Sequence, residues 1–285
     1  MLKVRNLVKI YPGAKRIAAN NISFDIEGGE ICAFLGMNGA GKSTTIKSIT
    51  GIIPFNRGQV LLNGYDIQQD PLGAKSQFGF VPDNYKLYEK LTGNELVNYT
   101  ADIYKIDSAT RKERIGRLAE MFKLTKAMNQ QIGSYSHGMK QKICLISTLI
   151  HNPSVWMLDE PMVGLDPQSI RAVKDYMVEH AKSGKVVFFS SHALDTVAGL
   201  CDRAIIIGAG KKLGDVKIAD VNKQEGGLER HFLDLVNKAD AEYQAFLRQL
   251  EHEEQELAAK HGKAKASAMM AKRAQDMALG KISND

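Results

Sequence analysis

Hydrophobic and polar residues alternate over residues 2–10 and 17–26 of the chain. A period of two is typical of a β-strand with one buried face. The turn sequence Tyr11-Pro12-Gly13 separates the two segments. The pattern therefore predicts a pair of antiparallel strands at the N-terminus.

Farther along, short apolar runs alternate with segments of helical period. The run at residues 155–158 is wholly apolar, as expected for a strand covered on both faces. We predict strands at 31–35, 59–62, 78–81, 155–158, 185–189 and 203–207, and helices at 43–50, 137–150, 167–182 and 193–200. This order indicates an α/β fold with a mainly parallel sheet and helices on both faces.

An inserted helical lobe is expected at about residues 84–152. From residue 94 to about 127 the apolar positions follow a helical period, with Thr92 and Ser108 as expected N-caps. Beyond residue 214 the alternation of strand and helix patterns ends, and we expect a helical C-terminal extension over 215–285.

The extension begins with an amphipathic helix expected at 228–236. An apolar stripe over 243–257 and a basic segment over 260–281 follow. The extension either packs on its own core or contacts a second copy, a membrane protein or anionic lipid at the membrane surface. The pattern leaves these alternatives open.

Composition excludes several classes of protein. The 285 residues are 44% hydrophobic and 25% charged, as in an ordinary globular protein. Cys32, Cys144 and Cys201 are far apart and include no CxxC pair, which argues against a disulfide framework or a zinc site. No apolar run approaches the roughly 20 residues that span a bilayer. The net charge of +6 arises before residue 211, since basic and acidic residues balance beyond it.

The most informative stretch is ICAFLGMNGAGKSTT, residues 31–45, an apolar strand leading through a glycine-rich turn into a helix. The pattern Gly36, four residues, then Gly41-Lys42-Ser43 is that of a phosphate-binding loop. Backbone N–H groups and the helix N-terminus would surround the phosphates, Lys42 would reach the outer ones, and Ser43 would bind Mg²⁺. The expected nucleotide-binding residues here are Gly36, Asn38, Gly39, Ala40, Gly41, Lys42, Ser43 and Thr44.

A second acidic motif follows the buried strand at 155–158. Asp159 stands at its carboxyl end, where a carboxylate can hold Mg²⁺ beside bound phosphates. Glu160 comes next and is placed to act as the general base for an attacking water. Together with the upstream loop, this pair predicts a site that binds and hydrolyses a nucleoside triphosphate.

The ordered set of motifs resembles the ATP-binding subunit of an ABC transporter, of the exporter type with a separate permease. The resemblance covers residues 11–214 and implies a P-loop NTPase core with an N-terminal antiparallel β subdomain, the inserted helical lobe and the helical C-terminal extension. It implies ATP and Mg²⁺ as cofactors. In this family two copies share each nucleotide, with one copy contributing the phosphate-binding loop and the other a signature motif.

The resemblance assigns further roles by position. Ser136-His137-Gly138 stands where the family has its Leu-Ser-Gly-Gly-Gln signature, so Ser136 and Gly138 are expected at the partner's nucleotide. His192 matches the switch histidine, which would act on the γ-phosphate with Lys42 and Glu160 as a catalytic residue. Two further nucleotide contacts are expected, from the D-loop and from an adenine-stacking ring: Asp166 and Tyr11.

Two positions depart from the family pattern. Asp83 stands where the family usually has a glutamine near Mg²⁺, and we expect it to join Ser43 and Asp159 at the metal. His137 replaces the first signature glycine, which adds bulk beside the phosphate contact.

The resemblance implies a motor at the cytoplasmic face of the cell membrane, attached through a transmembrane permease and working as a dimer, expected to be a homodimer. A non-transport ATPase of the same superfamily, acting in translation or DNA repair, is the alternative. A regulatory ATP binder is a third, which intact Lys42, Asp159 and Glu160 disfavour. No nucleic acid is expected to bind directly, because the sequence shows no basic patch interleaved with aromatic residues.

Overall fold

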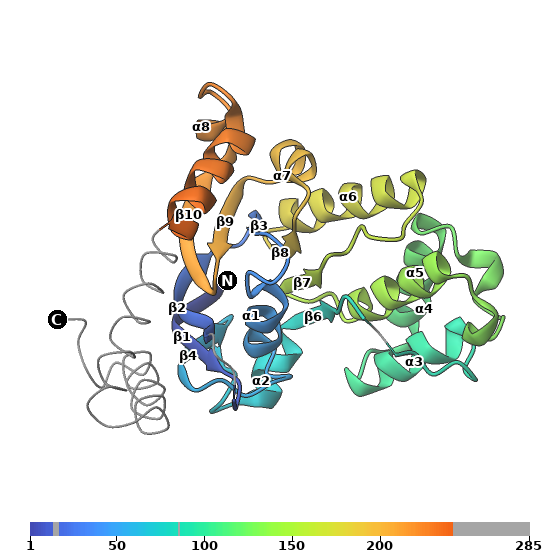
Figure 1. Ribbon diagram of the computed structural model, residues 1–285. Helices are drawn as coiled ribbons and strands as arrows, with labels where there is room; N and C mark the ends of the chain where they lie inside the picture. Colours follow the sequence, from blue (N-terminus) through green and yellow to red (C-terminus); the bar gives the residue numbers. More distant parts are fainter. Residues whose placement is uncertain (14–16, 85, 242–285) are drawn as a thin grey trace.

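Two β-sheets and a helical lobe organise the chain. The computed structural model describes residues 1–13, 17–84 and 86–241. In Figure 1 the N-terminal sheet and the helical lobe lie at opposite ends of the view, with the central sheet between them. The expected α/β fold, with an antiparallel β subdomain and an inserted helical lobe, is confirmed.

The N-terminal sheet has four strands in the order β2-β1-β4-β5. Every pair in it is antiparallel, so the predicted N-terminal pair is confirmed. The bounds are β1 (Leu2–Ile10), β2 (Ile17–Ile26), β4 (Arg57–Leu62) and β5 (Tyr65–Asp66). The two-residue strand β5 is too short to leave an alternation in the sequence, and we did not predict it.

The central sheet has six strands in the order β10-β9-β3-β8-β7-β6. All neighbours are parallel except β9 and β10, which are antiparallel. The bounds are β3 (Ile31–Leu35), β6 (Phe78–Val81), β7 (Val155–Asp159), β8 (Val186–Ser191), β9 (Arg203–Gly208) and β10 (Lys211–Lys217). Because β8 lies between β3 and β7, the loops that follow these three strands meet at one edge.

Helices cover the central sheet and form the lobe. Their bounds are α1 (Lys42–Ile49), α2 (Pro71–Ser76), α3 (Gly93–Ile103), α4 (Ser108–Met121), α5 (His137–Leu149), α6 (Pro167–Lys182), α7 (Leu194–Leu200) and α8 (Ile218–Val221), with 3₁₀ turns η1 (Thr125–Ala127) and η2 (Ile132–Ser134). Thr92 caps α3 as predicted, in a capping box with Glu95. The prediction of Ser108 as a cap was wrong by one residue, because the Asp107 carboxylate accepts from the Thr110 N–H instead.

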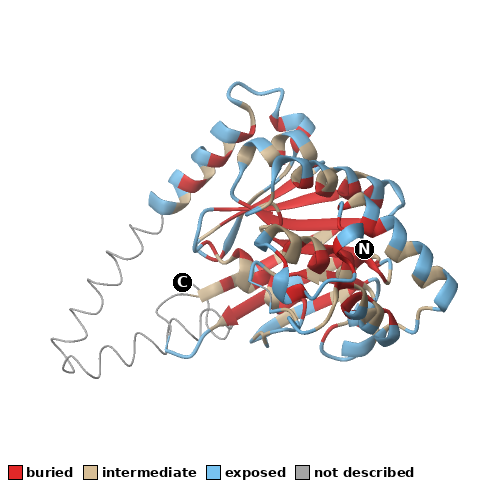
Figure 2. Cartoon of the chain, turned by 90° about the vertical axis from the view of Figure 1, so that its right-hand side faces the viewer, coloured by how far each residue is buried: buried red, intermediate tan, exposed pale blue. Residues whose placement is uncertain are grey.

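The hydrophobic core lies on both faces of the central sheet (Figure 2). Along β3, Ile31, Ala33 and Leu35 face one cluster, while Cys32 and Phe34 face the other. Burial on both sides explains why the central strands read as continuous apolar runs. The three cysteines are free and buried.

The chain beyond β10 returns to the core. A helix runs from residue 227 to 241, and Leu228, Phe232 and Val236 on one face of it are buried in the larger cluster. The amphipathic helix predicted at 228–236 is therefore confirmed. The predictions for 243–257 and 260–281 lie outside the described residues. No helix within the described part of the chain is both long and apolar enough to cross a bilayer.

Candidate nucleotide site

The loop between β3 and α1 has the conformation of a phosphate-binding loop. A Cβ on Gly36 would lie 2.6 Å from the Ile207 carbonyl oxygen, so the loop passes too close to β9 for a side chain. Gly41 has a φ of 103° and caps the start of α1. Only glycine adopts this conformation without strain. The remaining residues expected at the phosphates lie in the same loop and the first turn of α1: Asn38, Gly39, Ala40, Ser43 and Thr44.

Lys42 is folded back over its own loop. Its Nζ donates to the carbonyl oxygens of Gly36 at 2.8 Å and Met37 at 3.3 Å, and it lies 3.4 Å from Glu160 Oε1. The side chain is only 6% exposed. An ammonium held between a carboxylate and two carbonyls at the loop is positioned to exchange these partners for phosphate oxygens.

Glu160 lies at the centre of the site. Its Oε1 is 3.0 Å from His192 Nδ1, besides its contact with Lys42. Its backbone φ of 50° is unusual for a residue with a side chain, and such conformations concentrate at functional sites. The structure thus brings together all three residues predicted to be catalytic.

Asp159 has one carboxylate oxygen without a partner. Its Oδ1 accepts from Ser190 Oγ at 2.6 Å, while Oδ2 is buried with no hydrogen bond among the described residues. Burial raises the pKa of the Asp159 carboxyl, and the hydrogen bond from Ser190 and the nearby Ser43 hydroxyl oppose that rise. A buried acceptor beside the Ser43 hydroxyl fits a hard cation such as Mg²⁺, which prefers oxygen ligands.

Asp83, the third predicted metal ligand, has a different partner. Its Oδ1 lies 3.4 Å from Lys47 Nζ on α1. The described residues contain no group of three or more His, Cys, Asp or Glu that could hold a metal. The structure places Ser43 beside Asp159, whereas Asp83 pairs with Lys47 and acts on Asp159 as a nearby charge.

Ser190 belongs to the site and was missed by the sequence analysis. Its hydroxyl donates to Asp159, and it accepts the backbone N–H of Glu160 at 2.9 Å. One buried side chain thus holds both acidic residues. The signal was present in the sequence, since β8 changes from VVFF to two serines where a fully buried strand ends.

Tyr11 lies beside the first turn of α1. Its hydroxyl is 3.4 Å from Thr44 Oγ1, and Lys9 Nζ lies over its ring at 4.9 Å from the centroid. The ring is 40% exposed. It can therefore offer a surface to a base next to the phosphate loop, with Lys9 supporting it through a cation–π contact.

Ser136 and Asp166 each cap a helix. Ser136 is exposed, and its Oγ accepts from the Met139 N–H at 3.3 Å at the start of α5, where Gly138 also lies. Asp166 accepts from the Ser169 N–H at 2.9 Å. Hydrogen bonds from Ser169 lower the pKa of Asp166 to about 2, so this cap carries a full negative charge at neutral pH.

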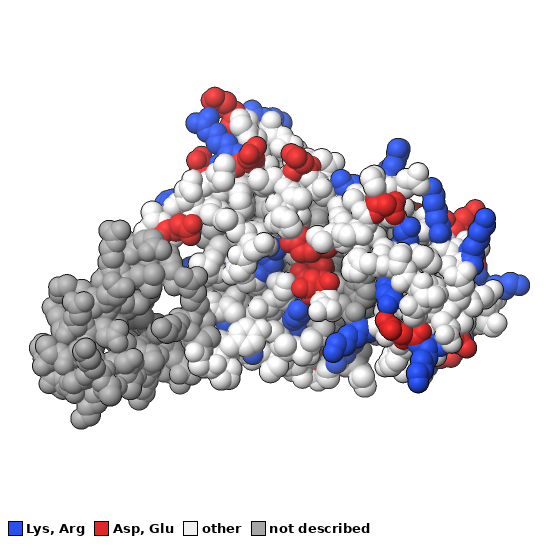
Figure 3. Space-filling model, turned by 45° about the vertical axis from the view of Figure 1, so that its right-hand side comes forward, with Lys and Arg blue, Asp and Glu red and all other residues white. Residues whose placement is uncertain are grey.

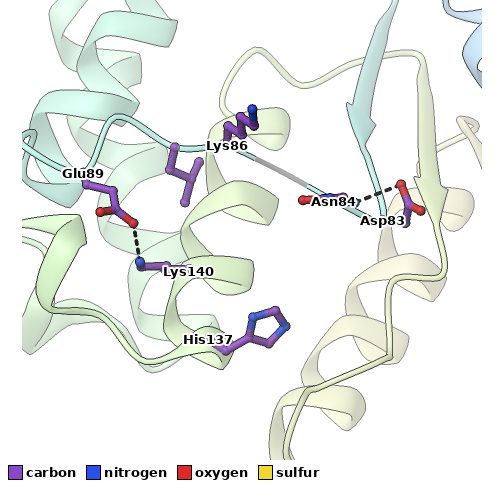
Figure 4. Close-up of a pocket in the computed structure, with 7 residues that line it drawn as sticks. Asp83, Asn84, Lys86, Glu89, His137 and Lys140 are labelled. Atoms are coloured by element: carbon purple, nitrogen blue, oxygen red, sulfur yellow. Dashed lines mark hydrogen bonds and ion pairs between the residues drawn. The ribbon is translucent and has the colours of Figure 1, made fainter.

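A pocket of about 430 Å³ separates Asp83 from the start of α5 (Figure 4). Asp83 and Asn84 line one side, and His137 and Lys140 line the other. Lys140 Nζ on α5 forms an ion pair with Glu89 Oε1 at 2.6 Å, and both residues line the pocket. The pocket therefore lies between the loop that leads into the helical lobe and the predicted signature motif.

Comparison with known proteins agrees with this geometry. The ABC transporter family model matches residues 19–163. The ABC-type transporter ATP-binding protein EcsA of Bacillus subtilis is 34% identical over 226 residues, 79% of this chain and 91% of that protein. The SkfA peptide export ATP-binding protein SkfE of the same organism is 32% identical over 224 residues, which are 79% of this chain and 92% of that protein. A solved ATP-binding subunit of an ABC transporter superposes with a TM-score of 0.77 at 31% identity, covering 82% of this chain and 99% of that one.

The chain belongs to the ABC transporter family as an ATP-binding protein, and it is an ATPase. The family expectation drawn from the motifs is confirmed.

Proposed function

We propose that this chain binds MgATP, dimerises with a second copy around it, and uses its hydrolysis to drive export through a separate transmembrane permease at the cytoplasmic face of the cell membrane. The observation that carries the proposal is the meeting of Lys42, Glu160 and His192. Glu160 and His192 directly follow the strands β7 and β8, and Lys42 begins α1 after the loop that follows β3. The three residues converge where a γ-phosphate would lie beside the loop. The name of SkfE, a peptide export protein, supports the direction of transport.

The chemistry follows from these positions. Glu160 takes a proton from water as the water oxygen bonds to the γ-phosphorus and the bond to the bridging oxygen breaks. Lys42 and His192 stabilise the charge that develops on the phosphate oxygens. Ser43 and Asp159 would hold Mg²⁺, which neutralises phosphate charge when bound.

Exposure around the loop supports a second copy as partner. Met37 beside the phosphate loop and Val163 in the loop after β7 are both 58% exposed. Ser136 is also exposed, so it is free to reach a nucleotide bound to another chain. A facing copy would cover these residues and complete the site.

The helical lobe offers a surface for a permease. Tyr88 and Tyr99 are 64% and 52% exposed and meet edge to face with ring centroids 6.4 Å apart. They line a shallow pocket of about 700 Å³ with Leu87 and Leu91. An exposed apolar surface of this kind suits an amphipathic helix of a membrane protein. Basic and acidic side chains are interspersed on the face in Figure 3, which does not favour nucleic acid as the partner.

The experiment that tests the proposal is Glu160→Gln with MgATP. We expect the variant to bind MgATP, to lose hydrolysis, and to elute as a stable dimer in gel filtration. Glu179→Gln is the matched control, because Glu179 is an exposed glutamate paired with Arg117 and far from the loop in sequence. Unchanged ATPase activity in Glu160→Gln would remove Glu160 from its role. For the export step, we expect a membrane protein to co-purify with the chain, and that protein to move its substrate outward in vesicles.

A further inference from the structure

The start of α5 packs closely against the loop between β7 and α6. We call this contact the α5–loop interface and define it by His137, Gln141 and Lys142 on α5 and Pro161, Gly164 and Asp166 in the loop. The α5 side begins one residue after Ser136. The loop side begins one residue after Glu160. The interface thus lies between the residue expected at the partner's nucleotide and the base expected at this chain's own.

The exposed His137 lies with its ring beside Gly164. A Cβ built on Gly164 would lie 2.9 Å from both Cδ2 and Nε2 of the His137 ring. Gly164 also has a φ of 81°, which favours glycine. The imidazole therefore packs directly on the backbone of the loop, a contact that a glycine at 137 could not make.

Gln141 lies one helical turn later, and only the nitrogen of its side-chain amide is hydrogen-bonded to the loop. Its Nε2 donates to the Pro161 carbonyl oxygen at 2.7 Å. Its Oε1 is buried and has no hydrogen bond within the described part of the chain, although the side chain is only 4% exposed. An unpaired buried acceptor is costly. Any shift of the loop that brought an N–H to this oxygen would therefore be favourable.

The loop between β7 and α6 is fixed by a hydrogen bond at its start and an ion pair at its end. The Val163 N–H donates to the Glu160 carbonyl oxygen at 3.3 Å. At its far end Asp166 lies 3.6 Å from Lys142 Nζ on α5 while it caps α6. Gly164 thus directly follows a short hydrogen-bonded turn that begins at Glu160.

We propose that His137 is a positioning residue that acts within its own chain: when Ser136 engages the partner's ATP, the His137 ring pushes on Gly164 and sets the position of Glu160. The inference rests on the proposed dimer, but it makes a separate claim about which of the two sites depends on His137.

Mixed dimers test this claim, because each contains only one active Glu160. In the first dimer, His137→Ala is in the chain with intact Glu160 and the partner carries Glu160→Gln. In the second, both substitutions are in the same chain and the partner is unchanged. The full-length chains carry two different tags, so that only mixed dimers are purified and assayed for ATP hydrolysis.

We expect hydrolysis to fall about tenfold in the first mixed dimer and to stay within about twofold in the second, each relative to the same dimer with His137 intact. His231→Ala, which removes a histidine from the last described helix, is the matched control and should change neither. If only the second dimer is impaired, His137 acts on the partner's nucleotide and the inference is wrong. Equal loss in both dimers also contradicts it. Failure of Glu160→Gln chains to dimerise on MgATP would instead overturn the proposed function.

Discussion

Two histidines, the buried His180 and the half-buried His151, should make the protein sensitive to mild acid. His151 stacks on Tyr104 with ring centroids 3.8 Å apart. The ring centroids of His180 and Trp156 are 6.0 Å apart. One ring nitrogen of each, Nδ1 of His151 and Nε2 of His180, is buried without a hydrogen bond among the described residues. Burial lowers the pKa of each histidine to about 4, and Lys185 adds to the effect on both.

The sign and the size of this pH effect follow from the linkage between protonation and folding. Because the pKa is lower in the folded state, the unfolded chain binds more protons between about pH 6.5 and 4, so stability falls as the pH drops through that range. With the ordinary histidine pKa of 6.5 in the unfolded chain and a folded value of about 4, each histidine costs about 2 kcal/mol between pH 7 and pH 5. The pair therefore removes about 4 kcal/mol, a large part of a typical domain's stability.

The assay uses urea unfolding followed by the fluorescence of Trp156, the single tryptophan, which is fully buried in this cluster. His180→Phe keeps an aromatic ring against Tyr176 and removes the titrating group. We expect the variant to lose about 2 kcal/mol less than the parent between pH 7 and pH 5. Any overpacking by the larger ring acts equally at both pH values and cancels. An unchanged pH dependence would refute the reasoning.

Three further predictions address the site and the lobe. Lys47→Met should free Asp83 and lower the Mg²⁺ concentration needed for half-maximal ATP binding, whereas an unchanged Mg²⁺ titration would leave Asp83 without a metal role. Lys9→Met should weaken ATP binding about two- to fivefold in calorimetry but not the binding of tripolyphosphate, since it removes the cation–π support of Tyr11. Thr92→Ala should destabilise the protein by about 1 kcal/mol in urea unfolding through loss of the capping box, and Thr92→Ser should retain most of it.

The sequence alone determined the elements and their chemistry. The alternation in β1 and β2, the apolar run of β7 and the α6 helix, predicted and observed at 167–182, are local patterns that depend on neighbouring residues. The phosphate loop was equally readable, because its glycines and lysine are consecutive in the chain. Local patterns failed where the element was very short, as in β5, or exposed at the sheet edge, as in β10, and at the cap of α4, where Asp107 rather than Ser108 accepts the hydrogen bond.

Tertiary structure decided which side chains meet. That Glu160 contacts both Lys42 and His192 depends on the order of β3, β8 and β7 in the sheet, which brings Lys42 to a residue more than 100 positions away. The pairing of Asp83 with Lys47 and the packing of His137 on Gly164 likewise arise between distant segments. Hydrophobic periodicity encodes which face of an element is buried, but not which other element covers it. The partners of a polar side chain are therefore set only when the whole core is assembled.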